Sequence, residues 1–193
     1  MPKIILITHQ KGGVGKSTLT FNLAQNLSGN AKVAVLDLDH QGSLIQIKKL
    51  VEGFTITSDE SVLTEEHIDF VFIDTPPYLS DKLPELIKRS DLILVPTKAG
   101  VLDLLAIEGT LDLIRKRSKE KNTMIVLNMI KHNTTLTTDI IEELNTTDFR
   151  VASTHISDLV VFTRSVLLKG VESNPNAQRQ IDGLTKEILT ALL

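Results

Sequence analysis

The stretch QKGGVGKST at residues 10–18 decides the fold. A β-branched, apolar run precedes it at 4–9, and a stretch with leucines at helical spacing follows it at 17–27. Its three glycines allow backbone angles and a close approach that side chains would prevent. Successive N–H groups in such a loop, with the N-terminus of the next helix, form an anion-binding nest. The stretch therefore predicts a phosphate-binding loop, and the alternative is a glycine-rich turn with chance lysines.

Two side chains of this stretch suit a nucleoside triphosphate. Lys16 would bring its ammonium to the β- and γ-phosphates, and the Ser17 hydroxyl would ligate Mg²⁺. The usual G-x-x-x-x-G-K-[ST] pattern has a glycine where this chain has Gln10, and here a further lysine, Lys11, follows. The loop thus departs from the ordinary pattern by one added cation.

This departure is informative, because KGGVGKST resembles the deviant Walker A motif of the ParA/MinD family of dimeric P-loop ATPases. The resemblance implies ATP and Mg²⁺ as cofactors, hydrolysis of ATP to ADP and phosphate, and a homodimer with ATP. It also implies that Lys11 reaches the nucleotide of the other subunit, where a cation stabilises phosphate charge. Lys11 and Lys16 are both expected to act in catalysis. The residues expected to hold the nucleotide are Lys11, Gly12, Gly13, Val14, Gly15, Lys16, Ser17 and Thr18.

An acidic segment supports the same family. VLDLDHQGS at 35–43 looks like the family's V-D-x-D-P-Q-G segment, with His40 where proline is usual. By this match Asp37 helps to hold the water shell of Mg²⁺, and Asp39 orients or activates the attacking water. The alternative is that both aspartates cap the following turn.

The resemblance continues along the chain. VFIDTPP at 71–77 is a strand that ends in an acid, the Walker B position, so Asp74 is expected to bind Mg²⁺ through water. LVPTKAGVLDL at 94–104 looks like the family's strand-to-helix junction. VLNMI at 126–130 is similar to the strand whose asparagine, here Asn128, lies near the adenine. The likeness covers essentially the whole chain, and its most specific motifs lie in the first half.

Short β-branched runs alternate with amphipathic stretches throughout. Several runs are apolar at every residue, which suits a parallel sheet covered on both faces. We therefore expect an α/β fold with a doubly wound, mostly parallel sheet and helices on both faces, in keeping with a P-loop NTPase of the deviant Walker A type. Residues 1–193 are expected to form one ATPase domain without a separate DNA-reading domain. Strands are expected at 4–9, 33–37, 70–74, 92–96, 123–129 and 151–155, and helices at 17–27, 81–88, 102–115, 139–144 and 176–192.

The composition excludes several kinds of site. The chain has no cysteine, which excludes disulfides, zinc–thiolate sites and the iron–sulfur proteins that share this loop. The histidines at 67, 132 and 155 lack ligand-like spacing, so no catalytic role is expected of them. Apolar runs are far shorter than the roughly 18–20 residues that span a bilayer, and the N-terminus leaves no room for a signal peptide. A cytoplasmic location is expected.

The function that the resemblance implies is that of a ParA-like ATPase in plasmid or chromosome partition. ATP-bound dimers would coat DNA without sequence preference and so associate with the nucleoid, and a ParB-like or other centromere-binding partner would stimulate slow hydrolysis. A net charge of −3 requires a local basic patch for this binding. Family resemblance favours the C-terminal basic residues, with Arg164 and Lys169. The cluster RKRSKEK at 115–121 is the competing patch, or a solvated helix C-terminus.

Three alternatives remain. A related ATPase would position a protein cargo, a MinD-like regulator would act at a membrane surface, and a synthetase resembling dethiobiotin synthetase would phosphorylate a small carboxylate. The final residues TKEILTALL carry one lysine and one glutamate, so their apolar stripe is assigned to the core and no membrane partner is expected. Lys11 and the segment 35–43 argue against the synthetase.

Overall fold

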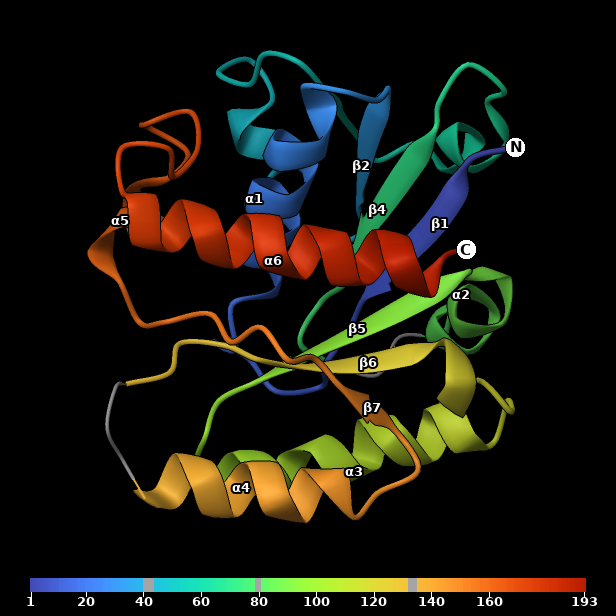
Figure 1. The fold of residues 1–193 in the computed structure, drawn as a ribbon. Coiled ribbons are helices and arrows are strands. Elements are labelled where there is room, and N and C mark those ends of the chain that lie inside the picture. The colour runs from blue at the N-terminus through green and yellow to red at the C-terminus, as the bar shows by residue number, and fades with distance from the viewer. Residues whose placement is uncertain (40–43, 79–80, 132–134) are drawn as a thin grey trace.

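The computed structural model describes residues 1–39, 44–78, 81–131 and 135–193. The histidine, glutamine and glycine of the motif at 40–42 lie outside the described residues. Seven strands form one sheet in the order β3-β2-β4-β1-β5-β6-β7, and every neighbouring pair is parallel (Figure 1). The strands are β1 (Lys3–Ile7), β2 (Val33–Asp37), β3 (Thr55–Thr57), β4 (Phe70–Asp74), β5 (Leu92–Thr97), β6 (Thr123–Leu127) and β7 (Arg150–Val151).

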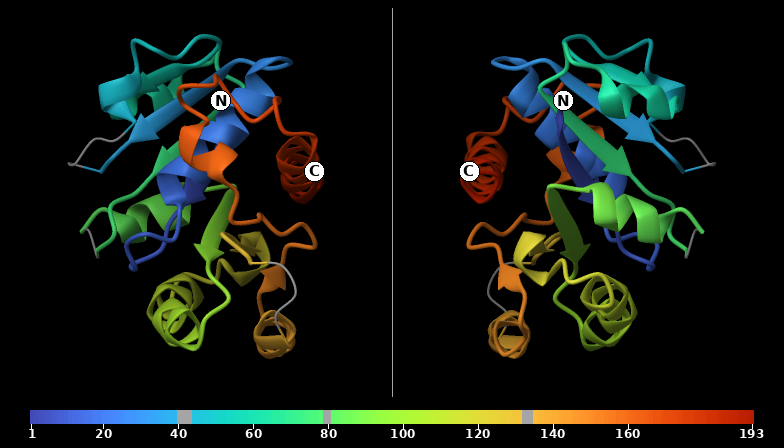
Figure 2. Two further views of the ribbon diagram at one scale, coloured as in Figure 1. Left: turned by 90° about the vertical axis from the view of Figure 1, so that its left-hand side faces the viewer. Right: turned by 90° about the vertical axis from the view of Figure 1, so that its right-hand side faces the viewer.

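Helices cover both faces of this sheet. The α-helices are α1 (Lys16–Ser28), α2 (Leu83–Arg89), α3 (Val101–Arg115), α4 (Thr135–Asn145), α5 (Val160–Arg164) and α6 (Pro175–Ala191). The short 3₁₀ helices are η1 (Ile45–Ile47), η2 (Glu60–Thr64) and η3 (Glu120–Asn122). The two side views show α6 and α1 on one side of the sheet and α2 and α3 on the other (Figure 2).

The strand β1 shows why its sequence is apolar at successive positions. Ile5 and Ile7 belong to the hydrophobic core under α1 and α6. Ile4 and Leu6 belong to the core on the opposite face, with residues of α2 and α3. Alternate side chains of a strand point to opposite faces, so a strand buried on both sides needs no polar positions. The loop that follows β1 therefore starts from a firmly packed central strand.

The order of the strands places the predicted site residues together. From β1 the chain runs first to β2 on one side of the sheet and later to β5 on the other side. In open α/β sheets, ligands bind outside the carboxyl ends of the strands at such a reversal. The strands β1, β2, β4 and β6 all end at this edge, where the predicted phosphate loop, Asp37, Asp74 and Asn128 lie at or directly after the strand ends.

The structure confirms the doubly wound α/β fold, with differences in particular elements. The last strand has two residues where five were expected at 151–155. The N–H groups of Ser153 and Thr154 donate to the carboxylate of Glu187 on α6, at 2.9 and 2.7 Å, instead of extending the strand. The helix α5 was not expected from the sequence, and α4 begins before the expected position 139. Among the helices that the structure describes, none is long and apolar enough to cross a membrane.

Candidate nucleotide site

The loop between β1 and α1 depends on two glycines with positive φ angles. Gly13 has a φ of +70° and Gly15 a φ of +86°, a region that other residues rarely adopt. A Cβ atom on Gly15 would also overlap Nδ2 of Asn128, so glycine is required there twice over. That same Nδ2 donates a hydrogen bond of 2.8 Å to the carbonyl oxygen of Val14. The asparagine predicted to lie near the base therefore also holds the shape of the loop.

Lys16 begins α1 and is buried within the loop. Its Nζ donates to the carbonyl oxygen of Lys11 at 3.4 Å. Burial lowers the pKa of Lys16, and the nearby carboxylates of Asp74 and Asp39 oppose that shift. The ammonium therefore lies between the loop and the acids, where it can meet an anion that the loop holds.

Lys11 is directed toward α3. Its Nζ forms an ion pair of 2.7 Å with Oδ1 of Asp103 in the first turn of that helix. Its backbone N–H donates to Nδ1 of His9 at 2.8 Å. Both ends of this residue are thus fixed by partners in its own chain.

His9 was not singled out by the sequence analysis, and the structure places it at the start of the loop. The side chain is fully buried, and burial, followed by the charge of Lys16, lowers its pKa to about 4. Because Nδ1 accepts the hydrogen bond from Lys11, the imidazole is neutral with its proton on Nε2. That Nε2 has no hydrogen-bond partner in the part of the chain that the structure describes. Its position next to the motif was the one sequence feature that pointed to it.

Asp37 and Asp74 end the neighbouring strands β2 and β4 and are paired in the strand register. The carboxylate of Asp37 accepts three backbone N–H bonds, from Asp39, Leu44 and Ile45 at 3.0, 3.2 and 2.8 Å. These bonds correspond to the turn-capping alternative for this aspartate. Burial nevertheless raises the pKa of Asp37, because it outweighs these bonds.

Asp74 lies at the bottom of the site and is fully buried. Neither of its oxygens has a hydrogen bond of normal geometry among the described residues, although the Ser17 hydroxyl lies near enough to favour the ionised carboxylate. Burial raises the pKa of Asp74 to about 7, the charges of Asp37 and Asp39 add to that shift, and Ser17 and Lys16 oppose it. A hydrated Mg²⁺ between this carboxylate and the Ser17 hydroxyl would supply the positive charge and the donors that Asp74 lacks. The residues present therefore fit a magnesium site.

Mg²⁺ requires only a small number of acidic side chains as ligands. Within residues 1–39, 44–78, 81–131 and 135–193, no group of three or more histidine, aspartate or glutamate side chains forms a metal cage. Mg²⁺ commonly keeps several waters and binds one or two carboxylates together with phosphate oxygens. A site with few protein ligands beside a phosphate loop meets that description.

A cavity of about 310 Å³ opens beside the loop. Leu19 and Phe162 give it apolar walls, while Asn128 and Asp158 supply polar atoms. Pockets of this size take small ligands, and a flat heterocycle with a few hydrogen-bonding atoms matches this lining. Much of the lining comes from residues 156–163, which carry no recognisable motif and which the sequence analysis missed.

The two basic residues expected to contact DNA differ in their surroundings. Arg164 ends α5 and is exposed, and its guanidinium has no hydrogen-bond or ion-pair partner among the described residues. Lys169 is exposed as well, but its Nζ lies 2.9 Å from Oε1 of Glu52. The charge of Lys169 is therefore partly offset by a neighbour.

The competing cluster at 115–121 is largely occupied by contacts within the chain. Arg115 forms ion pairs with Glu108, Asp112 and Asp148, and it lies over the ring of Phe149. Two further cations of the cluster, Arg117 and Lys119, donate to backbone carbonyl oxygens. This pattern favours the interpretation of the cluster as a stabilised helix C-terminus.

Comparison with known proteins identifies the family. The family described as the CobQ/CobB/MinD/ParA nucleotide binding domain matches residues 5–185. The maintenance of carboxysome distribution protein A of Halothiobacillus neapolitanus is 26% identical over 183 residues, which are 86% of this chain and 84% of that protein. The sporulation initiation inhibitor protein Soj of Bacillus subtilis is 24% identical over 200 residues, covering 75% of this chain and 79% of that protein.

Solved structures show the same fold. A plasmid partition protein from Borrelia burgdorferi bound to AMPPNP superposes with a TM-score of 0.80 at 22% identity, and the match covers 100% of both chains. A Cyanothece McdA–ATP complex also gives a TM-score of 0.80, at 18% identity, and covers 98% of this chain and 96% of the other. At this level of identity the likeness concerns the fold.

Proposed function

Because the chain belongs to the CobQ/CobB/MinD/ParA nucleotide-binding domain family, we propose that it binds and hydrolyses Mg²⁺-ATP as a dimerising switch. The observation that carries the proposal is Asp74, a buried carboxylate without a hydrogen bond of normal geometry among the described residues, close to Lys16 below a glycine loop. A carboxylate in that position is stabilised when a cation and phosphate arrive together. We further propose that residues 1–193 act as one ATPase domain.

Each part of the site has a role in this proposal. Residues 11–18 bind the phosphates through backbone N–H groups and through Lys16, and the cavity beside Asn128 receives the adenine. Ser17 and Asp74 hold Mg²⁺, Asp37 helps to hold its water shell, and the Asp37 carboxylate also accepts the backbone N–H of Asp39. Bound Mg²⁺ neutralises charge on the phosphate oxygens. Asp39 orients the attacking water, so that ATP and water give ADP and phosphate.

Lys11 links the nucleotide to dimerisation. In a single chain its ammonium is paired with Asp103. A second chain that offers a triphosphate provides a stronger anion, so the lysine exchanges one partner for the other when the dimer forms. The chemical step then depends on a geometry that the isolated chain does not have, and hydrolysis without a partner protein is expected to be slow.

For the cargo we propose DNA, in plasmid or chromosome partition. The Borrelia plasmid partition protein supports this choice, and Arg164 offers an exposed, unpaired cation in the described structure. ATP-bound dimers would bind DNA through phosphate contacts without sequence preference, and a ParB-like or other centromere-binding partner would trigger release. In cells, the ATP-bound protein would then be cytoplasmic and associated with the nucleoid.

The second candidate is the positioning of a protein cargo. It is favoured by the similarity to the carboxysome distribution protein, which spans more of this chain than the similarity to Soj. Both candidates use the same ATP switch, so they differ in what the dimer carries rather than in the chemistry of the site.

Sedimentation with DNA in ATP, in ADP and without nucleotide tests the proposal. We expect the protein to pellet with DNA in ATP alone, and added salt to release it, because counterion release drives such binding. Binding of ATP with no binding to DNA would favour the protein-cargo function. Failure to bind ATP would overturn the proposed function as a whole.

A further inference from the structure

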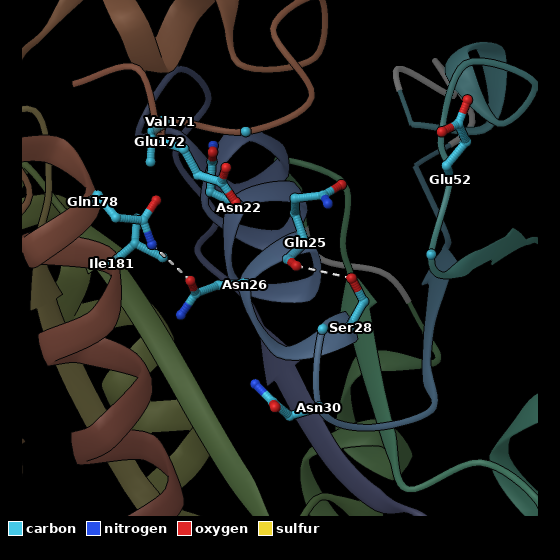
Figure 3. Close-up of a pocket in the computed structure, with 13 residues that line it drawn as sticks. Asn22, Gln25, Asn26, Ser28, Asn30, Glu52, Val171, Glu172, Gln178 and Ile181 are labelled. Atoms are coloured by element: carbon cyan, nitrogen blue, oxygen red, sulfur yellow. Dashed lines mark hydrogen bonds between the residues drawn. The ribbon is translucent and has the colours of Figure 1, made fainter. Parts of the chain in front are cut away.

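A second cavity, of about 470 Å³, lies between α1, α6 and two neighbouring loops. Figure 3 shows amide side chains of α1 along one wall and Gln178 of α6 opposite them, and Glu172 also lines the cavity. One loop contributes Glu52 and the other Glu172. The proposed ATP chemistry assigns no role to this cavity.

Asn22, which lines this cavity, has an unused acceptor. Its side chain is only 2% exposed, and its Nδ2 donates to the carbonyl oxygen of Thr18 at 2.8 Å and to Oγ of Ser165 at 3.0 Å. Its Oδ1 has no partner among the described residues. A buried carbonyl oxygen without a donor is unfavourable, so this atom would gain from a ligand that donates a hydrogen bond.

Two other polar side chains of the cavity, Gln178 and Ser28, direct their donors toward the protein. Gln178 Nε2 donates to Asn26 Oδ1 at 2.9 Å and to Asp182 Oδ1 at 2.8 Å, a contact visible in Figure 3 for Asn26. The Ser28 hydroxyl donates to the carbonyl oxygen of Gln25 at 2.8 Å. Gln178 and Ser28 therefore leave acceptor oxygens, rather than donor N–H or O–H groups, for a ligand.

The charged side chains at the cavity also favour a ligand that donates hydrogen bonds and carries positive charge. Glu52 is paired with Lys169, so this pair contributes little net charge. Glu172 is exposed and has no ion-pair partner among the described residues. We propose that the cavity binds a donor-rich cation, a guanidinium or alkylammonium group, between the Asn22 carbonyl and the Glu172 carboxylate.

The position of the cavity connects such a ligand to the nucleotide. Asn22 and Ile181 line both this cavity and the one assigned to the adenine, so the two cavities share a wall. A ligand that fixes Asn22 on one side changes the wall on the other, and any change in affinity is reciprocal. This step rests on the proposed function, whereas binding of the cation itself does not.

Calorimetry on the nucleotide-free protein measures binding of the cation separately from its coupling to ATP. L-Argininamide is the probe, and L-citrullinamide, which replaces the guanidinium by a neutral urea, is the matched control. We expect saturable binding of argininamide alone. Equal binding of both compounds, or no binding of either, would overturn the proposal whether or not the protein binds ATP.

Variants test the location of the site. Glu172→Gln should weaken argininamide binding roughly two- to fivefold, the effect of one exposed charge pair. Glu66→Gln removes the same charge from an exposed position outside the cavity and should leave binding unchanged. Equal effects of the two substitutions would refute the assignment to this cavity.

Two further titrations define the role of the ligand. A capped Gly-Arg-Gly peptide that binds more tightly than argininamide would identify an arginine of a partner protein as the source, and tighter binding of argininamide would identify a free small molecule. Saturating argininamide should change the affinity for ATP in the wild type more than in Glu172→Gln. An ATP affinity that does not respond would refute the coupling, and the titration without nucleotide would still decide the site.

Discussion

Lys11 and Asp103 join the phosphate loop to α3 by an ion pair of 2.7 Å between residues 92 positions apart in the sequence. A second contact runs parallel to it, since the backbone N–H of Gln10 donates to Oγ1 of Thr110 at 3.3 Å. Lys11 cannot contact a nucleotide in another chain while it holds Asp103. The ion pair therefore opposes the dimer that the deviant loop is proposed to form.

Replacing Asp103 should favour dimerisation. Asp103→Asn keeps the size of the side chain and removes its charge, so an ATP-dependent dimer should form about fivefold more tightly, equivalent to about 1 kcal/mol for a partly exposed pair. Sedimentation velocity in ATP measures this change. Asp112→Asn, which also removes a paired acid of α3 but lies away from the loop, is the control and should leave dimerisation unchanged. Equal dimerisation of all three proteins would show that the ion pair does not compete.

The two lysines of the loop should have separable effects. Lys16→Ala should abolish ATP binding, because it removes the cation within the cradle. Lys11→Ala should leave ATP binding intact and abolish the dimer, because it removes the cation offered to the second chain. Calorimetry measures the first property and light scattering the second. A Lys11→Ala protein that still dimerises with ATP would contradict the role drawn from the deviant motif.

Asp39→Ala should trap the ATP-bound state. The phosphate cradle is intact in this variant, but the attacking water loses its orienting carboxylate, so turnover should fall at least about a hundredfold. Gel filtration in ATP should show a stable dimer. Loss of ATP binding would instead identify Asp39 as a structural or metal-binding residue.

Asp74 predicts a distinct pH dependence of stability. Its pKa rises from an ordinary 3.8 to about 7 in the folded chain, so the folded state holds more protons than the unfolded state between these values. Stability from this group is therefore lost as the pH rises through that interval. In the absence of nucleotide, Asp74→Asn should stabilise the protein by up to roughly 4 kcal/mol at pH 8 and much less at pH 4.

Denaturant unfolding at several pH values measures this difference. The lowered pKa of His9 acts in the opposite direction over an overlapping interval, so the comparison must be between the variant and the wild type. Asp139→Asn, at an exposed position of α4, should give a flat difference. A flat difference for Asp74→Asn as well would mean that this carboxylate is ionised throughout.

Arg164→Glu should weaken DNA binding without affecting ATP binding or the dimer. Each lost phosphate contact should also reduce the slope of log affinity against log salt by about one unit. Arg89→Glu, an exposed arginine at the end of α2, is the matched control. DNA sedimentation at several salt concentrations provides both quantities, and equal behaviour of the two variants would exclude a specific role for Arg164.

The central part of the fold could be predicted because its determinants are local. Glycines at fixed spacing between an apolar run and a helix predict the loop after β1, and strand-ending acids predict the positions of Asp37 and Asp74. The registers of β1, β2 and β4 then bring these residues to one edge of the sheet without further information.

Long-range contacts set the limits of that prediction. The last strand is short because Glu187, more than thirty positions later, accepts the N–H groups that would have extended it. Lys169 was expected to contact DNA, and its partner Glu52 is 117 positions away. Residues 156–163 have no sequence pattern of their own. They line the cavity because the folded chain passes next to the phosphate loop at this point. None of these three features can be recognised from residues that are neighbours in the sequence.

The hydrogen bond from Asn128 to the Val14 carbonyl has a consequence for the speed of ligand capture. It fixes the conformation of the loop in the ligand-free protein, so little chain entropy remains to be lost when an anion arrives. Association should then proceed without a slow rearrangement of the loop, at a rate set by encounter and by the field of the lysines. The time for which the nucleotide stays bound, rather than the time it takes to enter, would set how long each cycle of the switch lasts.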